Sequence, residues 1–473
     1  MIQLPSLIGG LSANEIAALK RLCEIWEKKK ARNIKKSSYY DMKNRFNDLG
    51  ISIPPSLKST ETVVGWPAKA VDYLSARSIF DGYVFEDEDE LARRVNGVLA
   101  DNGFRSMYQQ ATTSELKHSC SFLTISKGGG SEPGVLISAY SAENAAAEWD
   151  HRLKRIKNGM TIIEKDDEGN PTWVNLYTKD AVIEVKKADA KWNAVRYEHK
   201  QGRPLMEALV YRPSLDRPFG KSRISRAVMS ITDSAIRTAL RAEVSAEFFT
   251  APQKYILGAD KSVFENKDKW EAYLGSIFMI TKDDDGDVPR FGQLSQMSMQ
   301  PHVDYMRSLA ARFSGETSIP VSALGVIHDN PSSAEAIYAA KEDLILEAES
   351  LNETNGNALR NIGMLVVAIM EDKSIKDLSD KERTISPKFK NPSMPSVVSQ
   401  SDAIVKQVSA INWIGETRVA LEELGYNETQ IMRMLEDKRK ARGSAIVAAM
   451  KEKALPEGDS SAAATIPPDG DRT

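Results

Sequence analysis

A single long amphipathic helix constrains this chain more than any other feature of its sequence. From Ser222 to about Phe249 the helical period runs almost unbroken, which at 1.5 Å per residue gives a helix roughly 40 Å long. One apolar stripe along it consists of Ile224, Val228, Ile231, Ala235, Ala239 and Ala242. A second stripe widens the apolar face beyond what one neighbour covers, and consists of Ile236, Leu240, Val244 and Phe248. We therefore expect two packing neighbours for this helix, from the same chain or from other copies of it.

Length and charge bound the rest of the chain. Its 473 residues exceed the usual size of a single core, so we expect two or more packed lobes. The 63 basic and 66 acidic residues give a formal charge of -3, and the pI is near 6.1. A chain so balanced does not hold nucleic acid electrostatically over its whole surface. Any contact with DNA must therefore be local or weak.

Cysteines and apolar runs predict a protein of the reducing cytoplasm. Cys23 and Cys120 are too few for a disulfide framework. Residues 1–22 lack a basic segment followed by an uninterrupted apolar core, so no secretory signal is predicted. The longest apolar run, residues 364–370, is far short of the roughly 20 residues that span a bilayer. We interpret it as part of a buried helix and expect no membrane contact.

The first half of the chain predicts helices followed by a β-rich region. Ser12 and Glu15 form the pattern of a capping box, which opens a helix within 12–50, and a second helix is predicted over 64–79. From about 104 to 212 the pattern changes to short runs rich in β-branched and aromatic residues. We predict strands in 161–178 and 180–187, with one helix, residues 142–157, inserted ahead of them.

The second half returns to helices around a small insert. Residues 250–298 are of mixed character, and 300–316 have helical period again. Pro320, Gly325 and Pro331 then break the chain, and a second capping box, Ser332 with Glu335, opens a helix that continues to about Asn352. A further apolar helix is predicted over 357–370. The Pro/Ser-rich residues 386–399 mark a boundary, after which only short helices are predicted.

Searches for catalytic and metal-binding motifs find little. The glycines of 126–134 lack the order of a phosphate-binding loop, and no GxSxG or HExxH pattern occurs. The acidic run 282–290 resembles a calcium loop, but with Gly286 at position six the required glutamate is replaced by Gly292. Magnesium bound by these surface carboxylates stays open. We therefore expect a protein that is not an enzyme and that carries no cofactor.

Three stretches carry a family resemblance. They are "VGWPAKAVDYLSARSIFDGY", "FGKSRISRAVMSITDSAIRTALRAEVSAEFFTAPQKYILG" and "GETSIPVSALGVIHDNPSSAEAIYAAKEDLILEAE". Together they resemble the portal proteins of long-tailed bacteriophages, especially those that infect actinobacteria, over most of residues 60–450. In that family twelve copies form a ring at one capsid vertex, through which double-stranded DNA enters and leaves.

The resemblance implies an α+β portal fold with named parts. These are a wing (1–220), a first stem helix (221–249), a clip (250–298), a second stem helix (299–315), a tunnel loop (316–331), a long helix that returns to the wing (332–396), a crown (397–453) and a flexible tail (454–473). The tail is short and mildly charged and the crown is modest, which departs from the better-known relatives and puts detailed crown contacts in doubt.

The implied contacts concern DNA and other virion proteins. In the tunnel loop, His328, Asp329 and Asn330 are candidate DNA contacts, with a simple solvated turn as the alternative. Because a ring multiplies each lining charge twelvefold, a conduit must avoid a strongly basic lining. The candidate clip interface, for the terminase packaging motor or the head-completion adaptor, consists of Lys282, Asp283, Asp284, Asp285, Asp287 and Arg290.

Further partners and rival functions complete the hypothesis. The resemblance implies contacts with scaffold and major capsid protein, and a location in the virion and, during assembly, in the host cytoplasm. One alternative is a nucleic-acid-processing enzyme, whose magnesium-dependent cleavage would be lost on changing Asp283 and Asp285 to Ala. The other is a capsid or baseplate component without a channel.

Overall fold

The computed structural model describes residues 8–44, 62–86, 88–188, 191–250, 254–257, 290–293, 298–325, 341–393, 397–426 and 428–454. The chain divides into two compact units, Met1–Ser393 and Met394–Thr473. The first unit combines helices with several antiparallel sheets, so the expected α+β class is confirmed. No helix in the described ranges is long and apolar enough to cross a membrane.

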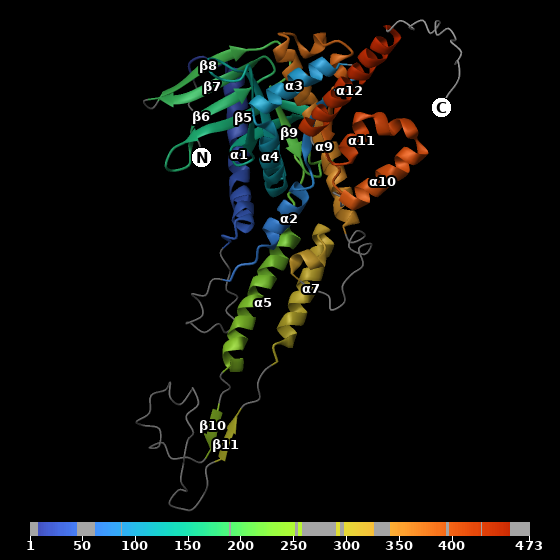
Figure 1. Ribbon diagram of the computed structural model, residues 1–473. Helices are drawn as coiled ribbons and strands as arrows, with labels where there is room; N and C mark the ends of the chain where they lie inside the picture. Colours follow the sequence, from blue (N-terminus) through green and yellow to red (C-terminus); the bar gives the residue numbers. More distant parts are fainter. Residues whose placement is uncertain are drawn as a thin grey trace, which may run out of the picture. The chain divides into compact units, whose positions relative to one another are not determined.

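A five-stranded antiparallel sheet and one long helix form the first layer pair. The strands follow in the order β4 (Ala145–Asp150), β5 (Arg155–Lys165), β6 (Pro171–Tyr177), β7 (Ala181–Ala188) and β8 (Lys191–Glu198). Helix α1 (Ala13–Tyr40) packs against this sheet (Figure 1), with Leu19, Leu22 and Trp26 buried among its apolar side chains. The predicted capping box at the start of α1 is confirmed, since Ser12 and Glu15 each accept a hydrogen bond from the other's backbone N–H.

A second sheet packs with three helices in the largest core. It has the order β3 (Val135–Ser141), β2 (Cys120–Lys127) and β9 (Met206–Val210). Helices α3 (Asp89–Asp101), α4 (Phe104–His118) and α9 (Glu342–Met370) contribute to the same core. Residues 364–370 belong to α9, and Leu365, Val366 and Val367 are fully buried there. The prediction of a buried helix at this apolar run is therefore confirmed.

The connector predicted over 386–399 begins with a strand. Strand β12 (Ser386–Phe389) pairs antiparallel with β1 (Phe80–Val84), and Phe80 lies opposite Phe389. Two short 3₁₀ helices, η4 (Ile375–Asp377) and η5 (Glu382–Thr384), precede it. The first unit therefore extends to Ser393, and the start of the predicted linker belongs to its core.

Helix α5 (Arg226–Thr250) finds both of its expected neighbours within the same chain. It packs along α7 (Gln300–Thr317), beside which it runs in Figure 1, and against α2 (Trp66–Ser75). The first four residues of the first apolar stripe, from Ile224 to Ala235, join a core with Phe313 of α7, whose ring lies 5.2 Å from that of Trp66. Ile236 and Leu240 of the second stripe are also buried. Packing of α5 therefore does not by itself require other copies.

Several sequence-based predictions are wrong in detail. Residues 142–157 form β4, a turn and β5 rather than a helix, because pairing in the sheet outweighs the helix propensity of their alanines and lysines. The turn is held by Asp150, whose carboxylate accepts from the backbone N–H groups of Arg152 and Leu153 at 2.9 Å. Residues 104–118 are helix α4, not the start of the β-rich region. Helix α9 is continuous through 353–356, where a break was predicted.

Two smaller parts complete the described chain. Strands β10 (Lys254–Leu257) and β11 (Arg290–Gln293) form an antiparallel pair within the predicted insert. The second unit contains α10 (Val397–Ala410), η6 (Asn412–Glu416), α11 (Arg418–Glu423) and α12 (Glu428–Ala454). With 27 residues, α12 is longer than the short helices that were predicted. The capping box at Ser332 and the tail after residue 454 lie outside the described residues.

Candidate functional site

The sequence-predicted site residues lie almost entirely outside the described chain. His328, Asp329 and Asn330 fall within 326–340, and the candidate clip residues from Lys282 to Asp287 fall within 258–289. Arg290 is described: it is the first residue of β11, it is exposed, and it lies opposite Leu257. The structure therefore brings none of these residues together, and their roles stay predictions.

A buried junction connects described segments that lie before, between and after residues 258–289 and 326–340 in the sequence. Its centre is Arg223, which precedes α5 and is 5% exposed. The guanidinium donates to the carbonyl oxygen of Ala70 in α2 and, at 2.6 Å, to that of Thr317, the last residue of α7. It also donates at 2.9 Å to the hydroxyl of Tyr211 and lies 2.5 Å from a carboxylate oxygen of Glu347 in α9. We call these five residues the Arg223 junction.

Charges within the junction compensate one another. Burial acts against the charged form of Arg223, but Tyr211 and Glu347 outweigh it and raise the Arg223 pKa. Burial likewise opposes ionisation of Glu347, yet Arg223 lowers the Glu347 pKa below its ordinary value. Burial raises the pKa of Tyr211 to about 12, so its hydroxyl stays protonated and donates to Glu347. The junction is therefore a desolvated but paired ion cluster.

This junction fixes the base of the α5–α7 pair to the rest of the first unit. Thr317 is followed by Ser318 in a left-handed conformation (φ 55°), which ends α7. The next residues form η3 (Val321–Leu324), and Lys69 of α2 donates to the carbonyl oxygen of Ala323 at 2.6 Å. The described start of the predicted tunnel loop is thus attached to α2. Sequence reasoning missed Arg223, because its partners are scattered along the chain and no local spacing signals them.

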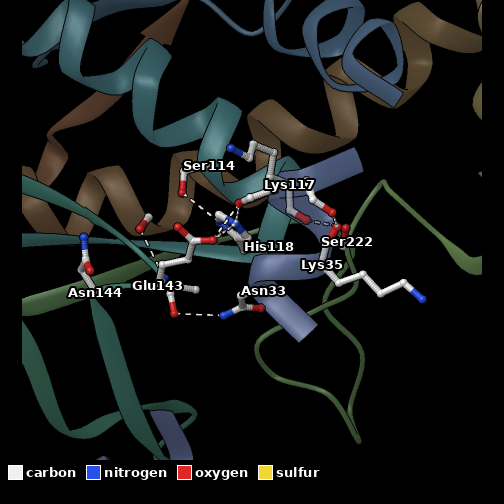
Figure 2. Close-up of polar contacts among 12 residues, drawn as sticks. Asn33, Lys35, Ser114, Lys117, His118, Glu143, Asn144 and Ser222 are labelled. Carbon is white, nitrogen blue, oxygen red and sulfur yellow. Dashed lines mark hydrogen bonds and ion pairs between the residues drawn. The ribbon is translucent and has the colours of Figure 1, made fainter. Parts of the chain in front are cut away.

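A second cluster has the composition of a hydrolase triad but not its geometry. Figure 2 shows His118 of α4 beside Glu143 and Ser114. Ser37 lies 3.0 Å from His118 Nε2 and donates to Glu143 at 2.7 Å, and Glu143 lies 3.5 Å from the same ring nitrogen. In a triad the carboxylate binds the other ring nitrogen, which leaves this one free to take the serine proton. The cluster therefore connects α1, α4 and the turn between β3 and β4 structurally, and it gives no case for nucleophilic catalysis.

The described residues also contain no candidate metal-binding site. Among them, no three histidine, cysteine, aspartate or glutamate side chains gather in a group that could hold a metal ion. Both cysteines are buried, and burial raises their pKa values to about 12. The described part of the chain thus presents packing and ion-paired junctions rather than reactive groups.

Comparisons with known proteins show what this chain is similar to. No family model matches the sequence. The chain is nevertheless similar over about nine-tenths of its length to phage portal proteins, which confirms the resemblance predicted from its sequence. The relatives are the portal protein of Mycobacterium phage L5, 26% identical over 447 residues, and that of Mycobacterium phage D29, 25% identical over 429 residues. The matches cover 91% and 88% of this chain and 90% and 87% of the relatives.

Solved structures give a looser likeness. A virion of a native gene transfer agent particle contains a chain with 12% identity and a TM-score of 0.41, with 73% of this chain and 85% of that one covered. The neck of a native particle of this kind, computed with C12 symmetry, gives 13% identity and a TM-score of 0.39, with 74% and 86% covered. These TM-scores are too low to carry an argument about this chain.

Proposed function

We propose that this chain is the portal protein of a tailed phage, which forms a ring at one capsid vertex. The observation that carries the proposal is the similarity to the Mycobacterium phage L5 portal protein over 447 residues, since it spans both units of the chain. The role is structural, and no catalytic activity is part of it. The virion is its place of action, and the host cytoplasm is where it assembles.

The parts of the ring follow the sequence boundaries. In this proposal α5 and α7 are the stem helices, β10 and β11 belong to the clip, and α10 to α12 belong to the crown. Packing of α5 along α7 supports the stem assignment, because in the sequence one helix precedes and the other follows the residues assigned to the clip. The Arg223 junction would fix the stem to the wing.

DNA would pass through the ring without sequence recognition. His328, Asp329 and Asn330 are the proposed contacts, and they offer polar groups without strong phosphate affinity. At the clip, Lys282, Asp283, Asp284, Asp285, Asp287 and Arg290 are the proposed contacts with the packaging motor and the head-completion adaptor. Scaffold and major capsid protein would surround the wing.

Native mass spectrometry and negative-stain electron microscopy of the purified chain test the proposal. Twelve copies, or a number close to it, and particles with a central hole are expected. A chain that stays monomeric at every concentration, or assemblies without a hole, would contradict it. Magnesium-dependent DNA cleavage that disappears in a chain carrying both Asp283→Ala and Asp285→Ala would instead favour a nuclease.

A further inference from the structure

In the described part of the chain, a buried carboxyl group between α4 and α9 has no cationic partner. Glu115 of α4 is 0% exposed, as is Asn355 of α9. The Asn355 amide donates to one Glu115 oxygen at 2.9 Å and lies 3.3 Å from the hydroxyl of Tyr108. That hydroxyl lies 2.8 Å from Ser78. We call these four residues the Glu115 cluster.

Acceptors outnumber donors around this cluster. The other carboxyl oxygen of Glu115, Oε1, is buried and has no hydrogen-bond donor in the described part of the chain. The same holds for the amide oxygens of Asn352 and Asn355 on α9. A single additional proton on Glu115 would turn one of these surplus acceptors into a donor.

The neighbouring elements supply no compensating positive charge. Tyr108 faces Glu115 from α4 itself, and Cys120 faces it from β2. The contacts from α9 are neutral amides, and the contact from the α2–β1 connection is the Ser78 hydroxyl. His118, one turn further along α4, contacts Ser37 and Ser114 instead. Lys36 of α1 acts on Cys120 rather than on Glu115.

An ionised carboxylate in this position is strongly disfavoured. Removing a charge from water without pairing it costs so much that such groups take up a proton instead. We propose that Glu115 is protonated, and therefore neutral, at neutral pH, and that this proton stabilises the packing of α9 against α4. Its loss in alkaline solution then weakens that packing. We call this interaction the proton latch. Burial supports this by raising the pKa of Glu115 to about 8, against the opposing hydrogen bond from Asn355.

The sign of the effect follows from the raised pKa. A group that binds its proton more tightly in the folded chain contributes stability that is fully present below its ordinary pKa of 4.5. That contribution is lost as the pH rises from there to about 8. In the proposed function α9 belongs to the long helix that returns to the wing (332–396), so loosening α9 would loosen that part. The proton latch itself does not depend on the proposed function.

Unfolding experiments on the full chain test the latch. Glu115→Gln keeps the shape and the neutral charge but cannot lose a proton, and Glu143→Gln is the matched control at a half-buried carboxyl group that contacts α4 through His118. Between about pH 5.5 and about pH 8.5, the folded-to-unfolded ratio of the wild type should fall by about a hundredfold relative to that of Glu115→Gln. The Glu143→Gln chain should fall as the wild type does. Equal pH profiles for wild type and Glu115→Gln would overturn the proposal.

Two measurements on the wild type remain informative if Glu115→Gln does not fold. Infrared difference spectra between about pH 6 and about pH 9 should show a protonated carboxyl band that is lost at the higher pH. Hydrogen exchange, corrected for the intrinsic effect of pH, should speed up in the middle of α9 but not in β5 and β6. A wild type without the carboxyl band at the lower pH, or with unchanged α9 protection, would refute the latch.

Discussion

Arg223 and Glu347 form an ion pair whose two side chains are only 3% and 8% exposed. Their atoms lie 2.5 Å apart, and the same guanidinium also binds the end of α7. One side chain thus connects the start of α5, the end of α7 and α9. Removal of either partner leaves the other charge buried without compensation.

Arg223→Met should be strongly destabilising for this reason. Loss of one member of a buried ion pair costs about 3–5 kcal/mol in the free energy of unfolding, measured by urea titration. Arg21→Met is the matched control, because Arg21 pairs with Glu148 but is itself 50% exposed, and it should cost about 1 kcal/mol or less. Equal costs for the two variants would mean that the Arg223 pair is not desolvated.

Phe313→Ala should disrupt the base of the α5–α7 pair. Phe313 is 0% exposed and contacts Trp66, so truncation of its ring should cost about 3–5 kcal/mol of unfolding free energy. Val303→Ala on the same helix is the control, since Val303 is 44% exposed and should change the stability by about 0.5 kcal/mol or less. Thermal denaturation followed by circular dichroism compares them, and a small Phe313 effect would show that this core is loosely packed.

Gly363→Ala should destabilise the chain even though alanine favours helices. A methyl group on Gly363 would lie 2.5 Å from Ile385 Cδ1 and 3.0 Å from the Tyr83 ring, both of which are buried. Overpacking of this kind costs about 1–3 kcal/mol. Gly97→Ala in α3 meets nothing within 4 Å and should instead stabilise by about 0.5–1 kcal/mol. Chemical denaturation of both variants should give changes of opposite sign in the free energy of unfolding. A stabilising Gly363→Ala would contradict the close approach of α9 to β1.

Glu143→Gln should change the response to acid in a defined window. The hydrogen bond with His118, assisted by Ser37, holds the pKa of Glu143 at about 2, below its ordinary 4.5. A lowered folded pKa contributes stability that is present above 4.5 and lost as the pH falls toward 2. The wild type should therefore lose more stability than Glu143→Gln between these values, in urea titrations at several pH values. Parallel losses would show that Glu143 is not held ionised by His118.

Local pattern alone determined several of the helices and much of the family resemblance. The capping box at Ser12 and Glu15, the long amphipathic run of α5 and the apolar run in α9 depend on neighbours three or four residues apart, and sequence spacing records these directly. It also determined the α+β class and the likeness to portal proteins, since three contiguous stretches carry that likeness.

Tertiary structure decided what depends on residues far apart in the chain. The alanines of β4 became a strand because β5 pairs with them, and residues 386–389 became a strand because β1 accepts them. The Arg223 junction and the Glu115 cluster exist only because distant segments together remove their ionisable groups from water. Desolvation depends on what surrounds a side chain in space, and for that reason spacing along the sequence could not reveal it.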